Sequence, residues 1–179
     1  MHFPIRIPKK CNLFKAAENG NIKFFTRNSK NIPIEFHKEI MNLSVKNGHL
    51  HLVIWLHENK IIYGKKAMDL AATHGHIDIL EFFHKNSENG CSRNAMDCAA
   101  KNGYFDIVKF LHFNRTEGCT TNAIDYAAKN GYFDIVKFLY LYRKEGYINA
   151  INLVDSEISK WIKEQNIIKE LISLWERCT

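Results

Sequence analysis

The sequence lacks any uninterrupted apolar run that approaches the roughly 20 residues of a membrane-spanning helix. Its opening, MHFPIRIPKK, contains two of the three prolines and no apolar segment as long as that of a secretory signal. We therefore expect an intracellular, cytoplasmic protein without a membrane partner. The five cysteines, an odd number, fit reduced thiols in that compartment rather than a disulfide framework.

Common catalytic motifs are also missing. The chain has no glycine-rich phosphate loop and no Gly-x-Ser-x-Gly nucleophile elbow. Nine histidines are present, but the close pairs His49/His51 and His74/His76 have no cysteine or carboxylate cluster at zinc-ligand spacing. The sequence therefore predicts a protein that is not an enzyme, with no catalytic residue, no metal site and no cofactor.

Composition permits a folded core and gives a mildly basic chain. Hydrophobic residues make up 46% and charged residues 25%, which argues against global disorder. The formal net charge is +6 and the pI is about 9.0. Such a balance favours acidic partners of any kind, but ordinary solubility is the more common reason for it.

An internal repeat is the main feature of the sequence. The segment AAKNGYFDIVKFL at 99–111 recurs without change at 127–139, and looser copies lie upstream. One glycine anchors each copy, and the successive spacings are 28, 27, 28 and 28 residues for Gly20, Gly48, Gly75, Gly103 and Gly131. A fixed period of this length is typical of a solenoid built from small supersecondary units.

Each copy predicts two short helices. The first ends in Ala-Ala-x-Asn-Gly, where glycine suits a left-handed C-cap. The second carries apolar residues at helical spacing, such as Phe105, Val108 and Leu111. One aspartate recurs in every first helix from Asp69 onward, and we assign it to the start of its own helix, where the dipole favours a carboxylate.

These copies resemble the ankyrin repeat family. Asn94–Ala100 occupies the place of the family's first-helix pattern, Tyr104–Leu111 occupies that of the second, and His49 and His76 match the histidine that follows the glycine. The resemblance implies an all-α, ankyrin-type helix-turn-helix solenoid that binds other proteins. These units are shorter than the family's 33 residues, which implies shortened or absent β-hairpin fingers. This short variant is similar to ankyrin proteins of amoebal giant DNA viruses and amoebae, so a viral chain would act in the host cytoplasm.

Three segments are expected along the chain: an N-terminal extension at 1–10, five ankyrin-like repeats at 11–147, and a degenerate terminal repeat with a C-terminal capping helix at 148–179. The last helix carries an apolar stripe, which we interpret either as a cap or as a docking helix through Trp161 and Trp175. The stripe contains Ile158, Trp161, Ile162, Ile168, Leu171, Ile172 and Trp175.

Binding is expected on the concave face of the first helices. Two positions of each first helix should point outward there, one of variable character and one mostly basic. The candidate partner-binding residues are Lys46, Leu70, Thr73, Cys98, Lys101, Tyr126 and Lys129. We expect a monomeric scaffold that binds another protein, with an acidic surface as the favoured target. The alternatives are weak nucleic-acid binding by the basic face, which lacks a recognised motif, and recruitment of a ubiquitin ligase through the C-terminal helix.

Overall fold

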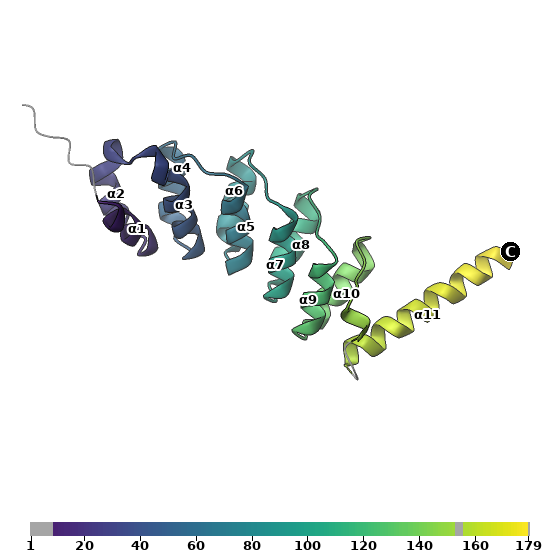
Figure 1. Ribbon diagram of the computed structural model, residues 1–179. Helices are drawn as coiled ribbons and strands as arrows, with labels where there is room; N and C mark the ends of the chain where they lie inside the picture. Colours follow the sequence, from purple (N-terminus) through teal and green to yellow (C-terminus); the bar gives the residue numbers. More distant parts are fainter. Residues whose placement is uncertain (1–8, 153–155, 179) are drawn as a thin grey trace, which may run out of the picture. The chain divides into compact units, whose positions relative to one another are not determined.

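A computed structural model describes residues 9–152 and 156–178, and within these ranges the side chains of all but residues 30, 151, 174, 175, 177 and 178 (Figure 1). Helices and turns account for the described residues, and no strand occurs among them. The chain divides into two compact units, Met1–Ala95 and Met96–Thr179. The boundary falls inside one short helix, α7 (Arg93–Lys101).

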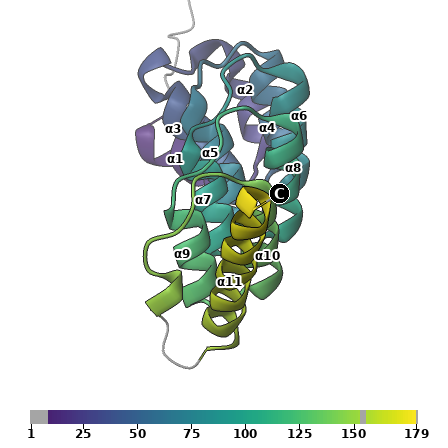
Figure 2. The same cartoon turned by 90° about the vertical axis from the view of Figure 1, so that its right-hand side faces the viewer.

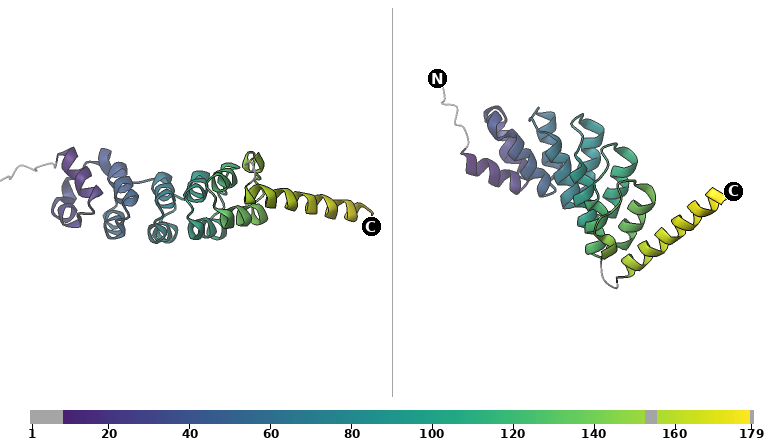
Figure 3. Two further views of the ribbon diagram at one scale, coloured as in Figure 1. Left: turned by 90° about the horizontal axis from the view of Figure 1, so that it is seen from below. Right: turned by 45° about the vertical axis from the view of Figure 1, so that its right-hand side comes forward.

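Unit 1 consists of successive helix pairs arranged in two rows (Figure 3). The first helices pack on one another, α1 on α3 and α3 on α5, and the second helices form the other row, α2 on α4 and α4 on α6. Their bounds are α1 (Lys10–Glu18), α2 (Ile22–Asn28), α3 (His37–Lys46), α4 (Leu50–Glu58), α5 (Lys65–His74) and α6 (Ile77–Asn86). Two 3₁₀ turns, η1 (Ser29–Asn31) and η2 (Ile34–Phe36), join α2 to α3.

Unit 2 repeats the same arrangement and then departs from it. The second helix α8 (Phe105–Asn114) packs on α10 (Phe133–Tyr142), and α10 packs on the first helix α9 (Asn122–Lys129). Where the next first helix would begin there is only the 3₁₀ turn η3 (Ala150–Asn152), which packs on α9. The next described element is the long helix α11 (Glu157–Cys178), whose first half contacts α10 through Trp161 and Asn166. In the view of Figure 2 it runs in front of α10.

The turn between the helices of a pair depends on its glycine. Gly103 has φ +79°, and its N–H bonds the carbonyl of Ala100 while the N–H of Tyr104 bonds that of Ala99. This is the Schellman arrangement, which needs a left-handed residue and therefore favours glycine. Gly131 repeats it with φ +79°. The predicted glycine C-caps are thus confirmed.

Alanine pairs allow the first helices to approach one another closely. Ala99 and Ala100 are fully buried, and the equivalent pairs of α5 and α9 are buried as well. The second helices supply the larger core side chains, among them Val108, Leu111 and Leu139. The core therefore lies between the two rows of each unit, and the first helices contribute larger side chains to it as well, such as Met96 and Ile124.

The recurrent aspartate does not serve its own helix, as the sequence interpretation had it. The Asp97 carboxylate, 4% exposed, accepts hydrogen bonds from the Thr120 N–H at 2.8 Å and the Thr120 hydroxyl at 2.7 Å. Asp69 binds Ser92 in the same two ways inside unit 1. Each carboxylate therefore satisfies donors at the start of the following repeat, 23 residues away.

The all-α architecture of ankyrin-type helix pairs is confirmed by these elements. Between α8 and α9 the connection runs through Arg115–Thr121, a turn in which the described residues form no β-hairpin finger. Only the first part of the apolar stripe of α11 is buried. Ile158 and Ile162 are 5% and 0% exposed, whereas Leu171 and Ile172 are 60% and 51% exposed.

Replacing Leu111 with alanine should lower the free energy of unfolding by about 2–5 kcal/mol, because the side chain is fully buried and a cavity would remain. The matched control is Leu141→Ala on α10, a leucine that is 63% exposed and should cost less than about 0.5 kcal/mol. Urea unfolding followed by circular dichroism gives both values. Equal midpoints for the two variants would contradict the placement of the core.

Asp97→Ala should lower the free energy of unfolding by about 1–3 kcal/mol, because it leaves the Thr120 N–H and hydroxyl without their buried acceptor. Asp106→Ala is the control. That carboxylate is 80% exposed and pairs with Lys109 on the surface of α8, where ion pairs contribute little. Thermal melts should separate the two variants by several degrees. A melting temperature for Asp97→Ala as high as that of the control would show that the link between repeats is unimportant.

Candidate functional site

The unit 2 part of the predicted binding surface lies on α7 and α9. Lys101 and Lys129 are exposed, Tyr126 is 38% exposed and Cys98 is half-buried. The ammonium nitrogen of Lys101 lies 5.4 Å from the centroid of the Tyr126 ring, within the range of a cation–π contact. The structure therefore brings Lys101 and Tyr126 together, and Lys129 lies one helical turn beyond Tyr126 on the same helix.

The unit 1 part lies on α3 and α5. Lys46 is exposed at the end of α3, while Leu70 and Thr73 of α5 are half-buried. The Thr73 hydroxyl donates to the Asp69 carbonyl at 2.7 Å, so it is engaged with its own helix. Of these three predicted residues, Lys46 presents the most accessible polar group.

The fold explains why these side chains point away from the core. On α7, Ala99 and Ala100 take the inward positions, so Cys98 and Lys101, on either side of them in sequence, turn outward. The same reasoning applies to Ala127 and Ala128 of α9, which leave Tyr126 and Lys129 outside. Each lysine of the surface occupies the last turn of its helix, where a cation complements the helix dipole.

The predicted tail residues have different surroundings. The Trp161 ring lies 5.7 Å from that of Phe133 and 5.3 Å from that of Tyr140, so this tryptophan packs α11 onto α10. The side chain of Trp175 lies outside the described residues. Exposed apolar side chains follow the packed part of α11, whose distal half extends away from α9 and α10 in Figures 1 and 3. They are Ile167, Ile168, Leu171 and Ile172.

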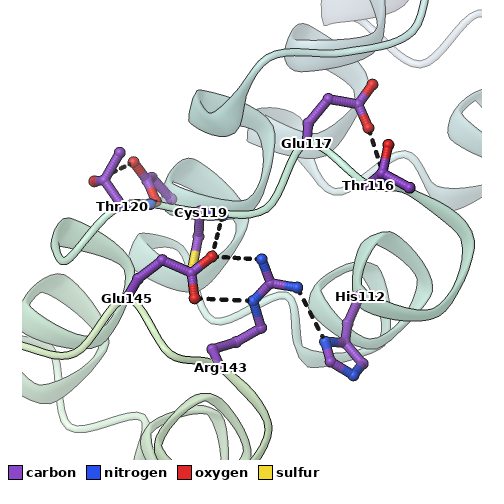
Figure 4. A network of polar contacts seen from close by, with 8 residues as sticks. His112, Thr116, Glu117, Cys119, Thr120, Arg143 and Glu145 are labelled. Atoms are coloured by element: carbon purple, nitrogen blue, oxygen red, sulfur yellow. Dashed lines mark hydrogen bonds and ion pairs between the residues drawn. The ribbon is translucent and has the colours of Figure 1, made fainter.

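A polar network, which the sequence interpretation missed, closes the two loops of unit 2 (Figure 4). The Arg143 guanidinium donates to the Glu145 carboxylate and, at 3.4 Å, to Nδ1 of His112. Glu145 in turn accepts the backbone N–H of Cys119 at 3.3 Å, which ties the loop after α10 to the loop after α8. The sequence signal was present in the recurring Arg-x-Glu-Gly at 115–118 and 143–146.

This network shifts the pKa values of its members. Burial raises the pKa of the Cys119 thiol to about 12, and the neighbouring Glu145 charge adds to that effect. Burial also raises the pKa of the Glu145 carboxyl, but hydrogen bonds from Arg143 and from backbone N–H groups outweigh it and lower the value to about 2. Burial and the Arg143 charge lower the pKa of His112.

Cysteine, histidine and glutamate thus lie close together without forming a thiol active site. A nucleophilic cysteine needs a lowered pKa and access for a substrate, whereas Cys119 has a raised pKa and is 1% exposed. In the part of the chain that the structure describes, no three histidine, cysteine or acidic residues form a group suited to a metal ion. None of the described helices is both long and apolar enough to cross a bilayer. The hydrogen bonds of Arg143 and Glu145 join the two short loops of unit 2.

Thiol labelling tests this closure. In the folded protein at pH 8, Cys119 should react with a disulfide reagent more than about a hundredfold more slowly than the exposed Cys11, because it is buried and protonated. Peptide mapping by mass spectrometry would give the two rates separately. In urea the difference should vanish.

Two variants make the same test specific to the network. Glu145→Gln should speed the labelling of Cys119, since it removes the charge that raises the thiol pKa and weakens the hold on Arg143. Glu117→Gln, which alters the equivalent pair with Arg115, serves as the control and should leave Cys119 unreactive. Fast labelling of Cys119 in the unaltered protein would show that the loops are open.

Comparison with known proteins gives one family. Residues 68–112 match a family model that is described as ankyrin repeats (many copies). No curated protein matches the chain. The matched segment includes 99–111, the thirteen residues that recur without change at 127–139, so the same repeat continues beyond it. Together with the glycine turns and paired helices, this match identifies residues 68–112 as members of the ankyrin repeat family.

Proposed function

We propose that the chain is a non-catalytic scaffold that binds an acidic protein in the cytoplasm through the outward face of its first helices. Ankyrin repeats mediate protein–protein interactions, and the first helices of each unit can present side chains to a partner. The observation that carries the proposal is the exposure of Lys46, Lys101 and Lys129, each at the last turn of a first helix.

The chemistry of this face favours a carboxylate-bearing partner. Lysine side chains attract carboxylates at long range and speed association, and the effect weakens as salt screens it. Tyr126 adds a tyrosine ring, and tyrosine is enriched among the residues that contribute most to binding in protein interfaces. Lys101 is held beside that ring by the cation–π contact, so part of the face is already ordered before a partner arrives.

A charge-reversal experiment tests the proposal. Changing Lys46, Lys101 and Lys129 to glutamate takes the formal net charge from +6 to zero. We expect this variant to lose at least about tenfold in affinity for the partner that wild-type protein captures, because attraction becomes repulsion. Capture from host-cell extract with mass spectrometry identifies the partner, and biolayer interferometry at several salt concentrations measures the affinity.

The control variant carries the same charge change elsewhere. Lys23, Lys85 and Lys144 are exposed and lie on α2, α6 and the loop after α10, outside the first helices. Their change to glutamate should leave the affinity within about twofold. Equal losses of affinity in both variants would show that the effect depends on net charge alone, and the proposed face would then be rejected. Retention of DNA or RNA on a filter with a steep salt dependence would favour the nucleic-acid alternative.

The distal half of α11 is the second candidate surface, since Leu171 and Ile172 are exposed there and an amphipathic helix can dock in a partner's groove. A partner that tolerates the lysine variant but is lost on changing Leu171 and Ile172 to serine would place binding on this helix. That outcome would support the ligase-recruiting alternative only if a ligase component were the captured protein.

A further inference from the structure

Three of the left-handed glycines, Gly20, Gly48 and Gly103, leave space that a ring from the following repeat fills. A Cβ atom added to Gly20 would lie 2.7 Å from the His49 ring, and one added to Gly48 would lie 2.6 Å from the His76 ring. In unit 2, a Cβ atom on Gly103 would lie 2.6 Å from the Tyr132 ring. The missing side chain is therefore what allows these rings to lie against the backbone.

Hydrogen bonds also hold the two histidine rings, whereas in unit 2 the equivalent carbonyl, that of Lys101, accepts the side-chain amide of Asn130 at 2.6 Å. The Nε2 atom of His49 lies 2.7 Å from the Glu18 carbonyl oxygen, and Nε2 of His76 lies 3.1 Å from that of Lys46. Both carbonyls are at the end of a first helix, where they have no partner within the helix and the dipole is negative. A ring that carries an N–H or O–H is therefore better suited to the position than an aliphatic side chain.

Gly131 has the same backbone conformation, but its surroundings differ. Its φ is +79°, and among the described residues no atom lies within 4 Å of an added Cβ. In the following segment the structure describes the 3₁₀ turn η3 and then α11 from Glu157, where earlier repeats have a first helix and a ring after it. A hollow of about 400 Å³ remains, lined by Ala128, Lys129, Gly131, Phe133, Ser156, Glu157 and Ile158.

We infer that this hollow, the Gly131 slot, receives a tyrosine or histidine side chain from a partner protein. The slot continues the surface that each earlier repeat presents to its successor, and the rings at Gly20, Gly48 and Gly103 show what that surface accepts. Lys129 occupies the position of Glu18 and Lys46, so its carbonyl oxygen would accept the hydrogen bond from the incoming ring. Ala128, Phe133 and Ile158 supply an apolar lining for the ring faces.

The inference goes beyond the proposed lysine face and can be tested apart from it with neutral probes. The full chain, labelled with ¹⁵N, is titrated at about pH 7.5, where an imidazole with a pKa of about 6.5 is mostly neutral. The probes are N-acetyl-tyrosinamide, N-acetyl-histidinamide and, as the aliphatic control, N-acetyl-leucinamide. We expect saturable shifts of the amide signals of 128–133 and 156–158 with at least one ring probe. The dissociation constant should be on the order of millimolar, as for any single side chain. Leucinamide should bind at least about tenfold more weakly.

Two variants make the test specific. Gly131→Asn should fill the slot, because asparagine tolerates the left-handed conformation and its side chain meets open space. It should weaken binding of the ring probe at least about tenfold at an unchanged melting temperature. His49→Ala should open an equivalent slot in unit 1, so that the histidine probe also shifts the signals around Gly20. This second variant keeps the inference testable if Gly131→Asn does not fold.

Three results would overturn the inference. The first is the absence of saturable shifts at the slot with either ring probe, and the second is equal affinity for leucinamide. The third is a shift of the same signals with protein concentration and without any probe, since that would place a second copy of the chain in the slot. Failure of the lysine-face experiment would leave these outcomes unchanged, because the probes carry no charge that Lys46 or Lys101 could read.

Discussion

The hydrogen bonds that one aspartate accepts from the start of the following repeat set the register of neighbouring helix pairs, at Asp69 in unit 1 and at Asp97 and Asp125 in unit 2. No single helix pair can bury its apolar face alone, so each pair needs its neighbour at a fixed height and rotation. Packing of alanine and leucine side chains is non-directional and leaves the position of one pair along the next loosely defined. The Asp97 carboxylate fixes that position, because it accepts hydrogen bonds from both the backbone N–H and the hydroxyl of Thr120.

The end of unit 2 shows what this bond can do without a full repeat. Asp125 accepts the N–H groups of Ile148, Asn149 and Ala150, three successive donors at the start of η3. The carboxylate thus binds the start of a helical turn as in the earlier repeats. The segment one repeat after Tyr132 belongs to α11, and it places no ring against Gly131 as His49 and His76 lie against Gly20 and Gly48.

Much of the fold could be predicted from the sequence because its signals are local. The glycine spacing predicts the turns, the Ala-Ala pairs predict close helix contacts, and Leu111 and Leu139 follow a helical period into the core. The exposure of Lys101, Lys129 and Tyr126 follows from the same period. A residue's inward or outward direction depends only on its own helix, and a repeated sequence states that direction several times.

The contacts between repeats were harder to predict, since they join residues far apart in sequence. Asp97 reads locally as a helix-dipole residue, and its true partner lies 23 positions later. The Arg143–Glu145 network depends on how close two loops come, and the stripe of α11 gives no sign of where the packing on α10 stops. Periodicity specifies a face but not what covers it, so Ile158 and Leu171 look alike in sequence and differ in the fold.

The short loops shift binding toward the helices and the end of unit 2. A β-hairpin finger would extend the contact surface beyond the first helices, but here Glu145 and Arg143 tie the loop after α10 to Cys119, and most polar groups of that closure already have partners. A loop satisfied in this way gains little from a new ligand, because a partner would have to replace existing hydrogen bonds. At the exposed lysines of the first helices and at the Gly131 slot, a partner would have to replace fewer existing hydrogen bonds. Recognition by this chain should therefore combine exposed lysines, which speed association with an acidic partner, with the Gly131 slot, which selects one side chain of that partner.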